Sequence, residues 1–115
     1  MKEYLFLLRG KKQPPGKIRE RQNKVDIDAW MEYFEKLEKG GKLVHSLSLA
    51  VSGRTITASN TLLNPVSSTK EGVIEAYLVL KAESLEAATD LARNCPHITD
   101  DGNIEIREIK PMLSP

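Results

Sequence analysis

Residues 71–111 read EGVIEAYLVLKAESLEAATDLARNCPHITDDGNIEIREIKP, and this stretch decides the fold. Apolar residues alternate over 73–81, which predicts a strand. Ser84 is a favourable N-cap residue, and the apolar side chains after it recur at helical spacing, so a helix follows. A Cys-Pro-His turn ends that helix, an Asp-Gly turn follows, and 104–110 is expected to form a last strand.

The upstream residues supply the other half of the same pattern. A continuous apolar run at 4–9 predicts a central strand, and 26–39 predicts an amphipathic helix. Residues 43–52 alternate as a strand and 54–58 are expected to return as a hairpin. A polar loop spans 59–72, although Thr61–Leu63 is short and apolar enough to extend the hairpin. The order βαββαβ predicts an α+β, ferredoxin-like fold.

Both expected helices carry an apolar stripe. The first is capped by Asp26 or Asp28 and ended by Gly40-Gly41. Its stripe consists of Ile27, Trp30, Met31, Phe34 and Leu37. The second stripe consists of Leu85, Ala88, Leu91, Ala92 and Cys95. Trp30 and Phe34 are therefore interpreted as core residues, and Cys95 as an inert core thiol.

Two helices of this kind are expected to cover one face of an antiparallel sheet. Regular alternation assigns to that face Leu47, Leu49, Leu78 and Leu80. The opposite face is then expected to carry Ser46, Ser48, Glu75, Tyr77 and Val79, with Glu105 and Arg107 or their neighbours. In a monomer, such a mixed face would be partly exposed to solvent. Packing it against a second copy would close a barrel around a partly polar cleft, so we expect a homodimer.

Composition narrows the class of protein. With 115 residues, one domain over 1–115 is expected. The single cysteine, Cys95, excludes an internal disulfide and fits a reducing compartment such as the cytoplasm. No apolar run is long enough for a secretory core or a membrane helix. The net charge of +1 gives no general bias toward nucleic acid.

Positive charge is nevertheless concentrated in one segment. Residues 9–24 hold seven arginines and lysines against Glu20 alone, a balance of 7 − 1 = +6. Pro14, Pro15 and Gly16 interrupt this segment, so 10–25 is predicted to be a basic loop. A solvated loop is the preferred interpretation. The alternative is a segment that binds an anionic ligand or nucleic acid, for example as a lid that recruits an acidic substrate. Nucleic acid is the less favoured partner, because the segment lacks the interleaved aromatic residues that stack on single strands.

Several motifs carry a family resemblance. They are EYLFLLRG at 3–10, Trp30 and Tyr33 followed by GKLV at 41–44, TKEG at 69–72, ARNCPH at 92–97 and GNIEIR at 102–107. Together they resemble the YCII-related family, also called the DGPF-domain family, over nearly the whole chain. The resemblance implies a dimeric α/β barrel of mostly unassigned function. A few relatives look like ring-directed lyases, and others are fused to sigma-factor regions.

Two departures from the family pattern concern the site. Where the family has Asp-Gly-Pro-Phe, this chain has Leu63-Asn64-Pro65-Val66. Some relatives pair a histidine of the first helix with an aspartate for acid–base work, and Trp30 occupies that position here. Because tryptophan cannot shuttle protons, the resemblance does not carry that mechanism over.

His97 is the catalytic candidate, because it follows a helix end and histidine titrates near neutral pH. The alternative is a C-terminal cap that bonds free helix carbonyls. The candidate ligand-binding residues are Glu75, Tyr77, Ser46, Ser48 and Arg107. In the preferred interpretation, however, Glu75 and Tyr77 are a dimer-interface pair bonded to Arg107 or to the partner. His45 is interpreted as structural.

No residue spacing suits a metal site, and no glycine-rich loop could hold phosphate, so neither a metal nor a cofactor is expected. Two functions of different class remain open. The first is a homodimeric small-ligand-binding or interaction module with a cleft at the dimer seam. The second is a cofactor-free, lyase-like acid–base enzyme acting on a small carbonyl or phenolic substrate. The departures at Trp30 and Leu63 favour the first.

Overall fold

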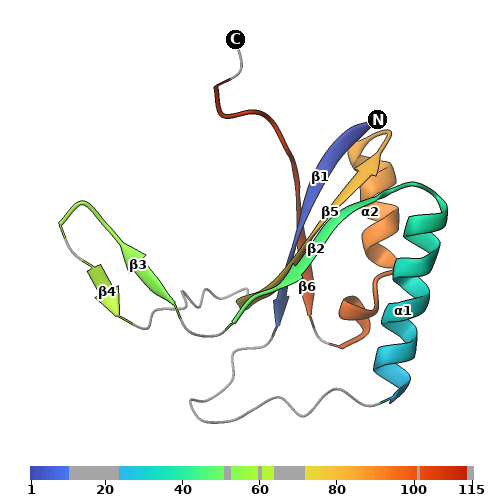
Figure 1. Cartoon of the computed structure of the whole chain (residues 1–115), viewed down its shortest axis with the longest axis horizontal. Helices are drawn as coiled ribbons and strands as arrows, with labels where there is room; N and C mark the ends of the chain where they lie inside the picture. Colours follow the sequence, from blue (N-terminus) through green and yellow to red (C-terminus); the bar gives the residue numbers. More distant parts are fainter. Residues whose placement is uncertain (11–23, 51–52, 60, 64–71, 101, 114–115) are drawn as a thin grey trace.

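The computed structural model describes residues 1–10, 24–50, 53–59, 61–63, 72–100 and 102–113 (Figure 1). Most of the predicted basic loop and most of the 59–72 loop lie outside these residues. The elements are β1 (Lys2–Gly10), α1 (Lys24–Lys39), β2 (Leu43–Ser48), β3 (Arg54–Ile56), β4 (Thr61–Leu63), β5 (Val73–Ala82), α2 (Leu85–Arg93), the 3-10 helix η1 (Pro96–Asp100) and β6 (Asn103–Glu108).

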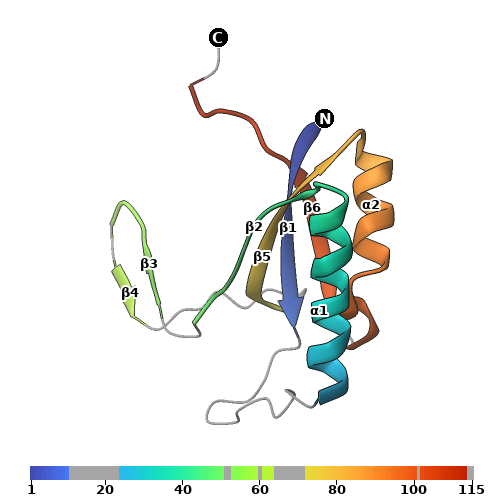
Figure 2. The same ribbon diagram turned by 45° about the vertical axis from the view of Figure 1, so that its right-hand side comes forward.

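The four long strands form one antiparallel sheet in the order β2-β5-β1-β6. The first strand of the chain is therefore central, as its continuous apolar sequence predicted. Figures 1 and 2 show α1 and α2 on one side of the sheet, with the β3–β4 hairpin standing away on the other side. This confirms the predicted α+β, ferredoxin-like architecture. Neither described helix has the length and apolar character that a bilayer-spanning helix requires.

The core lies between the sheet and the two helices. Alternate residues of β1 point into it, and Tyr4, Phe6 and Leu8 are each at most 2% exposed. The other strands and helices add Leu78, Leu80, Ala82, Tyr33, Leu37, Ala88, Ala92 and Cys95. Burial of this apolar surface is the main source of stability.

The buried stripe of α1 is centred on Tyr33 and Leu37, with Trp30 and Phe34 partly buried beside it. Met31 was assigned to the stripe but is 65% exposed, because it projects from another side of the helix. The helix begins at Lys24, so the aspartates predicted as caps lie inside its first turns.

Both helices have well-defined termini. At the end of α1, Gly41 adopts φ 67°, and the amide of Lys42 donates to the Leu37 carbonyl, which is the Schellman arrangement. At the start of α2, the predicted cap is confirmed, since Oγ of Ser84 accepts from the amide of Ala87 at 3.1 Å. Leu85, placed on the apolar stripe from its spacing, is 55% exposed.

The expected β2–β3 hairpin is wrong. β3 pairs with β4 in a separate two-stranded sheet, so Thr61–Leu63 is a strand rather than loop. The connections 49–53 and 57–60 are of similar length, so loop closure does not favour either pairing. β2 instead pairs with β5 along one edge.

A β-bulge in β2 reverses the faces predicted for that strand. Leu43 pairs with Leu80 but His45 pairs with Val79, so Val44 is an extra residue. Leu43 keeps its place against the core, and every residue after the bulge moves to the face opposite to that predicted. Leu47 and Leu49 are consequently 53% and 47% exposed instead of covered by helices.

Tyr33 joins the two helices, because its hydroxyl donates to the Leu91 carbonyl at 2.8 Å and burial raises the pKa of that hydroxyl. We expect Tyr33→Phe to lower the free energy of unfolding by about 1 kcal/mol. Tyr33→Ala should lower it by about 3–5 kcal/mol, since it also leaves a cavity. Urea denaturation measures both, with Met31→Ala as the control. Equal stability of all three variants would contradict the assignment.

Candidate ligand-binding face

The sheet face that turns away from α1 and α2 carries the candidate site (Figure 2). Residues paired across neighbouring strands share a face, so the pairing lays out its side chains in rows. One row consists of Leu47, Tyr77, Leu7 and Glu105. The next consists of His45, Val79, Leu5 and Arg107. These eight residues, together with Arg9 at the end of β1, are called the open face below.

An apolar floor runs along the middle of the open face. Leu5 and Leu7 of β1 and Val79 of β5 form it, and all three are partly buried although no helix covers them. Leu47 lies beyond Tyr77 at the β2 edge and is 53% exposed. Polar residues flank this floor on both sides.

An arginine–glutamate cluster, made of Arg9, Glu105 and Arg107, lies on one side of the floor. Nη1 of Arg9 donates to Oε1 of Glu105 at 2.6 Å, and Nη1 of Arg107 donates to Oε2 at 3.2 Å. The bond from Arg9, then that from Arg107, holds the pKa of Glu105 below its usual range. Two guanidinium groups against one carboxylate leave the cluster with one net positive charge.

Arg9 is the more enclosed of the two arginines. Its side chain is 14% exposed, whereas that of Arg107 is 69% exposed. Nε of Arg9 is buried and makes no hydrogen bond among the residues that the structure describes. Buried donors without partners are uncommon in folded proteins. Because its side chain is enclosed, Arg9 is the fixed part of the cluster, and the exposed Arg107 is its accessible part.

A hydroxyl–imidazole pair, made of Tyr77 and His45, lies on the opposite side of the floor. Oη of Tyr77 is 3.3 Å from Nδ1 of His45, and the two rings meet edge to face with centroids 5.5 Å apart. Regular alternation had assigned His45 to the helix side. The bulge at Val44 places it beside Tyr77, and alternation alone gave no signal for that.

The structure brings together only part of the predicted ligand-binding set. Tyr77 and Arg107 lie on the open face, in adjacent rows. Ser46 pairs with Leu78 and Ser48 with Ala76, which puts both serines on the helix-covered face, contrary to expectation. Glu75 is an extra residue in β5, because Leu8 pairs with Ala76 and Arg9 with Ile74.

His97 lies inside the fold and is 7% exposed. Its Nε2 is 2.7 Å from the main-chain carbonyl of Arg9, to which the ring N–H donates. Gly102 packs against the ring so closely that a Cβ atom there would collide with it. The His97 ring therefore bonds a carbonyl at the end of β1. It does not use this nitrogen to cap a carbonyl of α2.

Cys95 is 1% exposed and makes no disulfide. Burial raises the pKa of its thiol to about 11, although the His97 amide and the Tyr33 hydroxyl act in the opposite direction. A thiol that stays protonated at neutral pH is a poor nucleophile. Within the described ranges, no three His, Cys, Asp or Glu side chains gather as metal ligands would.

The contact between His97 and Arg9 leads to a stability prediction. His97→Asn should lower the free energy of unfolding by about 1–3 kcal/mol, because the Arg9 carbonyl loses its buried donor. His45→Asn, on the exposed side of the sheet, is the matched control and should change it by less than about 0.5 kcal/mol. Urea titration compares the two. Similar losses in both variants would show that the buried bond contributes little.

Comparison with known proteins identifies both a family and a structural neighbour. The YCII-related domain family matches residues 4–113. Among solved structures, the chain resembles the 5-chloro-2-hydroxyhydroquinone dehydrochlorinase TftG from Burkholderia phenoliruptrix AC1100, in complex with 2,5-dihydroxybenzoquinone. The two share 18% identity over 94% of this chain and 93% of the other, with a TM-score of 0.52, which shows a common fold. No curated protein matches the sequence.

Proposed function

Because the chain belongs to the YCII-related domain family, we propose that it is a homodimeric protein that binds a small molecule at the open face. The second copy covers this face and encloses the ligand between two sheets. The single buried thiol, Cys95, fits work in the reducing cytoplasm.

The observation that carries the proposal is the make-up of the open face. A ligand site needs an apolar surface for affinity and a few fixed polar groups for orientation. The open face supplies the floor of Leu5, Leu7 and Val79, with a polar group on each side. Its polar groups are held in place by contacts within the sheet, at 2.6 Å for Arg9–Glu105 and 3.3 Å for Tyr77–His45.

The same face supports the proposed dimerisation. Leu47 and Leu49 expose about half of their surface on the side without helices. An exposed apolar patch rimmed by polar residues is typical of an interaction surface. A two-fold axis would place this patch against its own copy, as in most homodimers. The polar clusters would then line the space between the sheets.

The structural neighbour supports the size of the proposed ligand. TftG was solved in complex with a small ring compound, 2,5-dihydroxybenzoquinone. A fold of this kind can therefore accommodate one ring. At 18% identity the neighbour carries no residue roles over to this chain.

A second proposal is a cofactor-free acid–base enzyme on a small carbonyl or phenolic substrate. The contact between Tyr77 and His45 favours it, because a phenol and an imidazole can both donate and accept a proton and this ring is accessible. His97 is less suited, since its Nε2 is bonded to the Arg9 carbonyl. Deuterium exchange at an acidic C–H bond of a bound ligand, lost in His45→Gln, would distinguish the enzyme from a binding protein.

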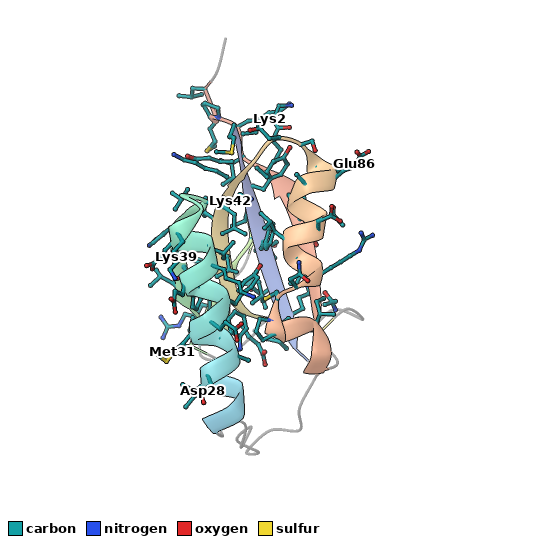
Figure 3. The ribbon with its side chains drawn as sticks, turned by 90° about the vertical axis from the view of Figure 1, so that its right-hand side faces the viewer. Lys2, Asp28, Met31, Lys39, Lys42 and Glu86 are labelled. Carbon is teal, nitrogen blue, oxygen red and sulfur yellow. The ribbon has the colours of Figure 1, made fainter. Side chains whose placement is uncertain are left out.

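The proposed assembly is tested with Leu7→Lys, which places a charge in the middle of the floor. The wild-type protein should have twice the chain mass of 12.9 kDa by light scattering, and Leu7→Lys should be a monomer. Met31→Lys is the control and should remain dimeric, since Met31 projects outward from α1 (Figure 3) and is 65% exposed.

The same variants test ligand binding. Benzoate should shift the amide resonances of β1, β5 and β6 in the wild-type protein and in Met31→Lys, but not in Leu7→Lys. A monomeric wild-type protein, or shifts confined to the helices, would overturn the proposed function.

A further inference from the structure

We propose that the open face selects a small planar ring compound with an acidic group at one end and a ring hydroxyl at the other, held in one orientation. The acid lies at the arginine–glutamate cluster and the hydroxyl at the hydroxyl–imidazole pair. This inference rests on the proposed function and specifies the ligand of that same site.

The first argument is the distance between the two polar groups. Tyr77 and Glu105 occupy the same row and are separated by Leu7 of β1. Two strand spacings of about 4.8 Å therefore lie between their Cα atoms, or about 10 Å. In this row, Leu7 is the one apolar residue between them. That geometry suits a single ring lying on Leu7, with one polar substituent directed to each side.

The second argument is the charge at the β6 side. Arg9 and Arg107 outnumber Glu105, and both guanidinium groups already bond its two oxygens. The accessible Arg107 presents further N–H donors, and a guanidinium binds a carboxylate with two parallel bonds. Arg9 and Glu105 position Arg107, which makes the direct contact with the acid.

The third argument is the different chemistry at the β2 side. A phenol and an imidazole can both donate and accept hydrogen bonds, so a ligand hydroxyl can be donor and acceptor there at once. The pair contains no guanidinium group that could bind a carboxylate with two parallel hydrogen bonds. The two sides of the floor therefore prefer different ligand groups, which fixes the orientation.

Three probes separate the two ends: 4-hydroxybenzoate, benzoate and phenol. Isothermal titration of the wild-type dimer should show 4-hydroxybenzoate binding about tenfold more tightly than either other probe, a difference of about 1.4 kcal/mol. Tyr77→Phe should reduce its affinity to that of benzoate and leave benzoate binding unchanged. Arg107→Gln should reduce it to that of phenol and leave phenol binding unchanged.

Matched controls use the same exchanges elsewhere. Tyr33→Phe changes a buried residue of α1, away from the open face, and Arg93→Gln changes an arginine of α2 that is 74% exposed. Neither should alter the affinity for any probe. His45→Gln is the second variant at the hydroxyl end and should lower the affinity for 4-hydroxybenzoate as Tyr77→Phe does. The test can therefore be completed even if one of the two variants does not fold.

The outcomes separate this inference from the proposed function. If benzoate and 4-hydroxybenzoate bind the open face equally, or if Tyr77→Phe weakens both alike, the orientation is wrong while the binding site stands. If Tyr77→Phe and Arg107→Gln change the proportion of dimer but no probe affinity, both groups are interface contacts and the orientation is wrong. If no probe shifts resonances of the sheet, the proposed function fails with the inference.

Discussion

The alternation of side chains along the central strand β1 is the constraint on which the rest of the structure depends. Tyr4, Phe6 and Leu8 are buried beneath the helices, and Leu5 and Leu7 form the floor of the other face. Both neighbouring strands take their register from β1, so the same few residues determine the core and the candidate site. A shift by one residue would exchange the two.

Arg9 connects the core and the open face within a single residue. Its main-chain carbonyl accepts from His97 inside the fold, and its side chain bonds Glu105 on the open face. The 3-10 helix η1 and strand β6 are thereby attached to the end of β1 from different directions. Tyr33 has a similar role among the helices, where its hydroxyl bonds the Leu91 carbonyl close to buried Cys95. Polar contacts of this kind add specificity to a core that is otherwise apolar.

The order of elements could be predicted because it depends on local signals, such as the Ser84 cap and the glycines after α1. The residues of the open face were predicted only in part, because the assignment of a residue to a face depends on strand register. Tyr77 and Arg107 were placed correctly from alternation, whereas His45, Ser46 and Ser48 were placed on the wrong sides by an unseen bulge. The bond between His97 and Arg9 spans 88 positions of sequence, so no local pattern could indicate it.

The bulge at Val44 also affects how this chain should be compared with its relatives. Val44 opposes no residue of its own on β5, so a relative that lacked it would keep every other side chain of β2 on the same face. An ungapped alignment of such a relative would match residues that point to opposite sides of the sheet. A one-residue gap at this position brings equivalent faces together, and only then do the residues aligned with His45 or Leu47 lie on the same side of the sheet.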